Sequence, residues 1–171
     1  MNALASRVDA AWAVLHTVPD PEVPAVSVCD LGIVRDVIEH DDGLEIVLTP
    51  TYSGCPATEA IEQAGLGRAR ATLRRAPAWT SDWISDEGRA KLKAYGIAPP
   101  AHLNAEQAAG TAVPIRLFGR IAGERIAGER IACPRCASER TERLSAFGST
   151  ACKALYRCMA CKEPFEHFKP F

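Results

Sequence analysis

The sequence predicts an α+β protein with two domains: one over residues 1–100 with the element order α-β-β-α-β-α, and a small cysteine-rich domain over residues 132–171. Three observations predict this class. The first hundred residues show helical and strand periodicity in turn, a turn motif separates two β-branched runs, and two C-x2-C motifs stand near the C-terminus. With 171 residues, 47% of them hydrophobic, the chain can bury a core, which excludes disorder as a description of the whole.

The first predicted element is an amphipathic helix that ends before Pro19. Apolar residues recur along it at helical spacing: Leu4, Val8, Ala11, Trp12 and Leu15. Residues 18–24 contain three prolines, which exclude a helix or an inner strand, so we expect a loop. Two strands follow at residues 31–39 and 44–51. The intervening His-Asp-Asp-Gly at residues 40–43 is typical of a hairpin turn, with its Asp-Gly supplying the positive φ.

A second helix is predicted from about residue 56 to residue 75. Its first residue is a proline, which suits the start of a helix, although Gly65 and Gly67 weaken the middle. Residues 79–84 are predicted as the third strand. A last helix, capped by serine and ended by glycine over residues 85–96, completes the first domain.

Residues 101–131 are interpreted as a linker. The stretch follows two prolines, is rich in Ala and Gly, and leads into a tandem RIAGE repeat at residues 120–132. A five-residue period fits neither a helix nor a strand, so a duplication that lengthens a spacer explains the repeat better than a folded array.

Four cysteines near the C-terminus predict a tetrahedral metal site: Cys133, Cys136, Cys158 and Cys161. Two C-x2-C pairs separated by 21 residues have the spacing of a zinc ribbon, in which two knuckles bring four thiolates around one zinc ion. Strands at residues 141–147 and 154–156, with Gly148 at the turn, would complete the ribbon. Four thiolates leave no open coordination position, so we expect the zinc to be structural.

Two further side chains of the tail lie outside this pattern. Cys152 could pack as a small apolar residue, substitute in the tetrahedron, or be a separate reactive thiol, and we favour packing. His167 is an alternative ligand by type, but a single histidine near a chain end is more often a solvated side chain.

The charge pattern excludes some function classes. The formal charge of the chain is −1, so no global field draws it to nucleic acid or to an anionic membrane. The first hundred residues are acidic and the tail is basic, but four thiolates around zinc would cancel most of the basic charge of the tail. No apolar run approaches the ~20 residues of a membrane span, and no secretory signal is visible, so we expect a cytoplasmic protein with reduced cysteines.

The second chemical signal is the segment Thr49–Pro56. A strand ends in a tight turn that delivers Cys55 to the start of a helix, where the dipole and free N–H groups favour a thiolate. We expect Cys55 to be exposed, acidic, and reactive or metal-contacting, with a buried structural cysteine as the alternative. Asp20 and Glu22 lie near another thiol, Cys29, but carboxylates in a proline-rich loop more often fix a turn.

Five segments together resemble the PaaD (PaaJ) family of accessory subunits associated with phenylacetyl-CoA 1,2-epoxidase: DPEVP at 20–24, SVCDLGIV at 27–34, TPTYSGCP at 49–56, WTSDWI at 79–84, and FGSTACKALYRC with EPF at 147–165. The first hundred residues are similar to the iron–sulfur cluster assembly (FSCA-like) domain of SufT-type proteins, and the cysteine-rich tail is what distinguishes the PaaD type. The linker repeat departs from the family pattern.

The resemblance implies a maturation factor in aerobic phenylacetate degradation. Such a factor would assist iron or iron–sulfur centre assembly in a client, the reductase or the di-iron oxygenase component of the epoxidase complex. We expect no catalytic activity of its own, since the chain lacks the Glu and Glu-x-x-His pairs of a di-iron site. The resemblance places Cys55 at the position of the assembly-domain cysteine, and Asp20 and Glu22 in its signature loop, as candidates for transient contact with iron or a cluster.

Two alternatives come from other function classes. One is a thiol-redox or electron-transfer component in which Cys29 and Cys55 cycle, and the other is a nucleic-acid-binding zinc ribbon, for which we expect little affinity. An exposed hairpin edge also favours a homodimer.

Overall fold

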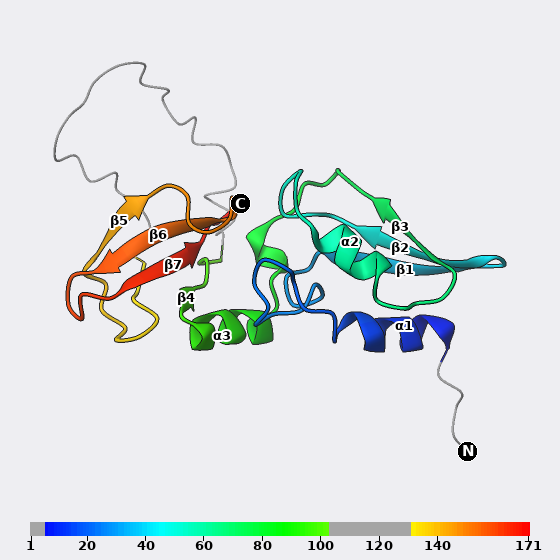
Figure 1. Cartoon of the computed structure of the whole chain (residues 1–171), viewed down its shortest axis with the longest axis horizontal. Helices are drawn as coiled ribbons and strands as arrows, with labels where there is room; N and C mark the ends of the chain where they lie inside the picture. Colours follow the sequence, from blue (N-terminus) through cyan, green and yellow to red (C-terminus); the bar gives the residue numbers. More distant parts are fainter. Residues whose placement is uncertain (1–5, 103–130) are drawn as a thin grey trace, which may run out of the picture.

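The computed structural model of the protein describes residues 6–102 and 131–171 (Figure 1). These residues form a three-stranded sheet of order β1-β2-β3 and a four-stranded sheet of order β4-β7-β6-β5, which lie side by side. The RIAGE units before residue 131 and the predicted helix residue Leu4 lie outside the described residues. Within the described part, no helix has both the length and the apolar character needed to cross a membrane.

The first helix, α1 (Arg7–Leu15), begins with a capping box. The Ser6 hydroxyl accepts a hydrogen bond from the Asp9 N–H at 3.1 Å, and the Asp9 carboxylate accepts one from the Ser6 N–H at 3.2 Å. The helix buries Ala11 and Leu15. The predicted helical spacing is therefore confirmed, and its apolar face packs into the core.

The predicted hairpin is formed by β1 (Val34–His40) and β2 (Gly43–Leu48), which pair antiparallel. Gly43 is not one of the positive-φ glycines, so the expected reason for a glycine there is wrong. The actual reason is a close approach: a Cβ on Gly43 would lie 2.1 Å from the Arg68 carbonyl oxygen, which accepts the Leu44 N–H at 2.8 Å. The following strand can therefore pair with β2 only if this position lacks a side chain.

The second helix is much shorter than predicted, because α2 covers only Ala57–Glu62. Gly65 and Gly67 adopt φ values of 71° and 68°, which reverse the chain and end the helical path. The chain then forms β3 (Ala69–Leu73), which pairs parallel with β2. The prediction of a continuous helix to residue 75 is wrong, since pairing with an exposed strand edge satisfied the backbone better than an interrupted helix.

The expected third strand at residues 79–84 is also wrong. A short 3-10 turn, η1 (Ser81–Trp83), stands there, and the Thr80 hydroxyl accepts the Asp82 N–H at 3.4 Å. The order α-β-β-α-β-α nevertheless holds, because β3 replaces the misplaced strand before the last helix.

The last helix, α3 (Asp86–Tyr95), follows the prediction closely. The Ser85 hydroxyl accepts the Gly88 N–H at 2.9 Å, and Gly96 ends the helix in the left-handed conformation with φ of 97°. These local signals were sufficient because neither depends on distant parts of the chain.

The C-terminal sheet contains four strands: β4 (Ile97–Ala98), β5 (Thr141–Ser145), β6 (Lys153–Cys158) and β7 (Pro164–Phe168). Strands β5 and β6 were expected, whereas β4 and β7 were missed. Strand β4 pairs parallel with β7, placing Ile97 opposite Glu166 and Ala98 opposite His167. The segment directly after α3 therefore supplies an edge strand of the C-terminal sheet (Figure 1).

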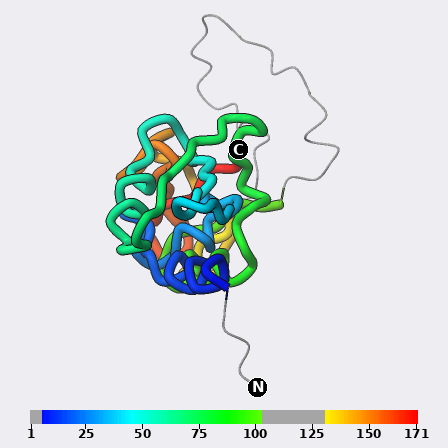
Figure 2. Tube along the Cα trace, turned by 90° about the vertical axis from the view of Figure 1, so that its right-hand side faces the viewer, coloured from blue at the N-terminus to red at the C-terminus, as the bar shows by residue number. Residues whose placement is uncertain are grey.

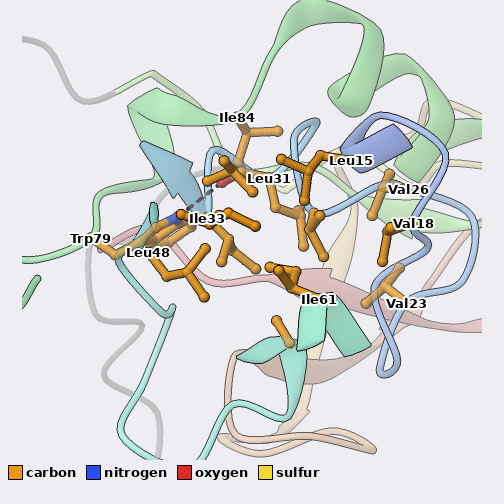
Figure 3. Close-up of a cluster of buried hydrophobic side chains, with 14 of the residues drawn as sticks. Leu15, Val18, Val23, Val26, Leu31, Ile33, Leu48, Ile61, Trp79 and Ile84 are labelled. Atoms are coloured by element: carbon orange, nitrogen blue, oxygen red, sulfur yellow. Dashed lines mark hydrogen bonds between the residues drawn. The ribbon is translucent and has the colours of Figure 1, made fainter. Parts of the chain in front are cut away.

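The main core is shared between the two sheets. Trp79 donates from its indole N–H to the Leu31 carbonyl at 2.9 Å, beside Ile33 and Leu48 (Figure 3). Phe168 and Cys152, both from the C-terminal part of the chain, belong to the same buried cluster. A second, smaller cluster lies within the C-terminal sheet: Ala98, Ile131, Cys133, Cys158 and Phe165.

The end of the chain returns to the first domain (Figure 2). The Phe171 carbonyl accepts the Ser81 N–H at 3.2 Å and the Thr80 hydroxyl at 2.8 Å. The rings of Phe168 and Phe171 lie 5.9 Å and 6.0 Å, centroid to centroid, from the ring of Trp79. The cysteine-rich part is thus packed on the first domain through aromatic contacts and hydrogen bonds.

His167 is buried, so the expectation of a solvated side chain is wrong. It is 2% exposed, its Nε2 has no hydrogen-bond partner among the described residues, and it meets the Tyr156 ring edge-on at 5.6 Å between centroids. Burial lowers the pKa of His167 to about 4. The imidazole is therefore neutral in the folded protein at neutral pH.

This burial predicts an acid-sensitive term in the stability. Below the ordinary pKa of 6.5 the unfolded chain binds a proton at His167 that the folded chain does not bind, so stability falls as the pH drops toward 4. Between pH 7 and pH 5 the term amounts to about 2 kcal/mol. Urea unfolding at both pH values should show this loss in the wild type and not in His167→Phe. Metal release by acid is common to both proteins and cancels in the comparison, so equal pH dependence would contradict the prediction.

Candidate metal centres

The structure brings the four predicted metal-ligating sulfurs together in what we call the cysteine quartet. The Sγ atoms of Cys133, Cys136, Cys158 and Cys161 all lie within 4.8 Å of one another. The Sγ–Sγ distance is 3.8 Å between Cys133 and Cys161 and 3.5 Å between Cys136 and Cys158. A tetrahedron with metal–sulfur bonds of about 2.3 Å has edges of about 3.8 Å, so the quartet has the size of a four-thiolate metal site.

Two equivalent knuckles build this quartet. In each, the residue after the second cysteine adopts a positive φ, 57° at Ala137 and 68° at Lys162. Each of these residues donates its N–H to the carbonyl of the first cysteine of its pair, at 2.9 Å for Cys133 and 3.0 Å for Cys158. The two C-x2-C motifs therefore fold into the same turn, which directs two sulfurs of each pair to one point.

The knuckle backbone also favours the anionic form of the sulfur. The N–H groups of Cys161 and Ala160 act on the Cys158 sulfur, with Ala160 N at 3.4 Å, and lower the pKa of Cys158 to about 6. Deprotonated sulfur is the form that binds metal. With four sulfur donors and no position left for water, the arrangement suits a structural ion.

Neither Cys152 nor His167 takes part in this site. Among the described residues, the cysteine quartet is the one group of three or more His, Cys, Asp or Glu side chains whose ligand atoms converge. Cys152 is 3% exposed and packs in the main core, which agrees with the packing interpretation and excludes substitution in the tetrahedron.

Cys55 lies directly before α2, at the end of the turn that follows β2. It is half-buried and packs against the main core. Burial is the largest influence and raises the pKa of Cys55, although the Ala57 N–H and the Thr51 hydroxyl act in the opposite sense. The expectation of an exposed, acidic thiol is therefore wrong, because a six-residue helix offers too little stabilisation to outweigh desolvation.

Asp20 fixes the proline-rich loop. Its Oδ1 accepts the N–H of Glu22 at 3.0 Å and of Val23 at 2.8 Å, and the residue is 2% exposed. Burial is the first cause that raises the pKa of Asp20, with the nearby charge of Glu22 adding to it. The carboxylate thus has the turn-fixing role that such loops favour, and it also lies close enough to act on Cys55, whose pKa its charge raises.

Tyr52 connects the loop to the Cys55 turn and was missed in the sequence. Its hydroxyl donates to Glu22 Oε1 at 2.5 Å, and this hydrogen bond is the largest cause that raises the pKa of Tyr52. The available signal was its place in the turn, three residues before Cys55. The hydrogen bond could not be predicted, because it joins residues 30 positions apart.

The C-terminal domain reaches the same loop through Lys153. This side chain is 3% exposed, forms an ion pair with Glu166 at 3.1 Å, and donates to the Glu22 carbonyl at 3.4 Å. The charges of Glu22 and Asp20 both act on the thiol of Cys152, where burial is the main cause that raises the pKa. The Cys55 turn therefore faces groups from both domains.

Cys29 is half-buried, and burial raises the pKa of its thiol to about 12. At neutral pH the thiolate that disulfide exchange requires is scarce at this position. A redox cycle of Cys29 with Cys55 stays a prediction.

Comparisons with known proteins match both parts of the chain. An iron–sulfur cluster assembly protein family matches residues 8–80, and a PaaD zinc beta ribbon domain matches residues 122–169. A crystal structure of a domain of unknown function, DUF59, from Bacillus anthracis has a TM-score of 0.46 and 22% identity, over 51% of this chain and 92% of that one.

Two curated relatives extend these matches. The chain is 33% identical over 88 residues to a protein of Porphyromonas gingivalis (strain ATCC BAA-308 / W83) named "Fe-S protein maturation auxiliary factor", covering 46% of this chain and 83% of the relative. It is 44% identical over 166 residues to a protein of Escherichia coli (strain K12) that is named as a subunit of 1,2-phenylacetyl-CoA epoxidase, covering 92% of this chain and 90% of the relative. Because this second similarity spans both domains and nearly the whole of each chain, the protein belongs to the PaaD family.

Proposed function

We propose that the protein is a maturation factor of a phenylacetyl-CoA epoxidase system, which carries iron or an iron–sulfur cluster to a client subunit through Cys55. The similarity to an epoxidase subunit and to iron–sulfur assembly proteins supports an accessory role in such a system. The observation that carries the finer proposal is the separation of two kinds of sulfur: a closed quartet in the ribbon, and a half-buried thiol beside carboxylates in the assembly domain.

The surroundings of Cys55 suit transient binding. Thiolate and carboxylate are both ligands of iron, and Cys55 lies near two carboxyl groups, Asp20 and Glu22. Iron binds the deprotonated thiol, so a raised pKa makes binding weaker at neutral pH and couples it to proton release. A weak, proton-linked site can load and unload cargo, which a carrier requires and a resident cofactor site does not.

We assign zinc to the cysteine quartet, held by Cys133, Cys136, Cys158 and Cys161. Sulfur-only donors and tetrahedral spacing match a structural zinc ion, which would crosslink the two knuckles. In this proposal the ribbon docks the client, either the reductase or the di-iron oxygenase component, while the assembly domain carries the cargo.

The test is Cys55→Ser, co-expressed with the epoxidase subunits. We expect the iron content and the epoxidation rate of the purified complex to fall several-fold, because serine keeps the size of the side chain and removes the soft ligand. Cys29→Ser is the matched control, since Cys29 is also half-buried against the same core. Equal iron content with Cys55→Ser and with the wild type would remove Cys55 from the mechanism.

A further inference from the structure

Cys152 belongs to the C-terminal domain but packs in the main core, outside the cysteine quartet. We propose that Cys152 is a second sulfur ligand for the iron or iron–sulfur cargo that Cys55 contacts, so that the two domains together form the carrier site. This inference rests on the proposed function and adds a ligand to it.

A chain of contacts joins the two thiols. Lys153, the residue after Cys152, donates from its ammonium group to the Glu22 carbonyl at 3.4 Å. The Glu22 carboxylate accepts the Tyr52 hydroxyl at 2.5 Å, and Tyr52 begins the turn that ends at Cys55. Each link is a hydrogen bond between segments that are distant in sequence, so the tertiary fold holds the two cysteines at one site.

The electrostatic neighbourhood is shared in the same way. The charges of Asp20 and Glu22 act on both Cys55 and Cys152, and the charges of both thiols act on the phenol of Tyr52. Such mutual influence requires the groups to lie within a short distance of one another. The same five side chains therefore surround one region, which receives a cysteine from each domain.

The position of Cys152 is held by its own strand and turn. Its Sγ lies 3.1 Å from the Thr150 hydroxyl, and its carbonyl accepts the Lys169 N–H at 2.9 Å. The buried Lys153, paired with Glu166, supplies a positive charge beside the two carboxylates. This charge would offset part of the negative charge that appears when both thiols lose their protons.

Two sulfurs change what the site can bind. A single cysteine holds iron through one bond, whereas a second thiolate on the same protein binds at a high effective concentration and closes a chelate. Binding one ferrous ion by both cysteines would release two thiol protons to solvent and would oxidise nothing. Thiolate pairs of this kind also ligate iron–sulfur clusters.

The test uses the full-length, zinc-loaded protein and ferrous iron alone, under anaerobic conditions. Zinc should stay in the quartet, because thiolate sites prefer zinc to ferrous iron, and its content is measured in each sample. X-ray absorption at the iron edge counts the sulfur neighbours of bound iron. We expect two sulfurs in the wild type, one in Cys152→Ser and one in Cys55→Ser, with at least a tenfold loss of iron affinity in each variant and no change in Cys29→Ser.

The outcomes separate the two claims. One sulfur neighbour in the wild type, or unchanged iron binding in Cys152→Ser with weakened binding in Cys55→Ser, would overturn the role of Cys152 and leave the proposed function standing. Iron binding that does not depend on Cys55, or no iron binding at all, would overturn both. The wild-type sulfur count decides the question even if Cys152→Ser folds poorly.

Discussion

Removal of the metal from the cysteine quartet is expected to unfold the C-terminal sheet and to expose Trp79 in the first domain. A structural zinc site contributes about 10–16 kcal/mol to folding, which matches or exceeds the whole stability of an ordinary domain, about 5–15 kcal/mol. Two quartet members, Cys133 and Cys158, lie in the small core beneath the site, so loss of the ion also releases that core. Phe168 and Phe171 would then leave the ring of Trp79.

Tryptophan fluorescence measures this prediction directly. Chelation should shift the emission to longer wavelength as water reaches Trp79, and added zinc should reverse the shift. The same titration of Trp79→Phe should show little of the change, because Trp12 and Trp83 lack these contacts with the C-terminal rings. Unchanged emission after complete removal of the metal, verified by elemental analysis, would show that the sheet folds without the ion.

The second large effect is expected from Phe168→Ala. Phe168 is 0% exposed, ends β7, and packs in the main core against Trp79. Loss of a buried phenylalanine costs about 3–5 kcal/mol through lost burial and the cavity that remains. Here the loss falls at the junction of the two sheets, so we expect it to weaken their association as well as the free energy of unfolding.

Urea unfolding, followed by circular dichroism, gives the magnitude. Phe147→Ala is the control, because Phe147 is 65% exposed and meets chiefly the Lys169 ammonium at 4.6 Å from its ring centroid. We expect this control to change stability by about 0.5 kcal/mol or less. Similar losses in the two variants would mean that Phe168 is not a junction between the sheets.

Part of the candidate site could be predicted because its signals are local. The quartet follows from the spacing of two C-x2-C pairs, each of which folds into the same turn over a few residues. The helix ends at Ser85 and Gly96 were visible for the same reason. Asp20 was recognised as a loop residue, although its nearness to Cys55 was available only from the family resemblance.

Other features depend on contacts between distant segments. Gly65 and Gly67 could be read as weak points in a helix, but β2 had to offer a free edge before residues 69–73 could become a strand. The raised pKa of Cys55 comes from burial, which no local pattern reports. The hydrogen bond from Tyr52 to Glu22 likewise joins two loops whose approach depends on the whole fold.

From its amino acids alone, the protein is predictable as an α+β chain with a four-sulfur metal site, because backbone periodicity and ligand spacing are short-range properties. Only the folded chain decides that β4 crosses into the C-terminal sheet, that Phe168 fills the first domain's core, and that Cys152 and Cys55 share one set of neighbours. The physical reason is that burial and long-range pairing are collective: each side chain acquires its surroundings from segments that its own neighbours in sequence do not specify.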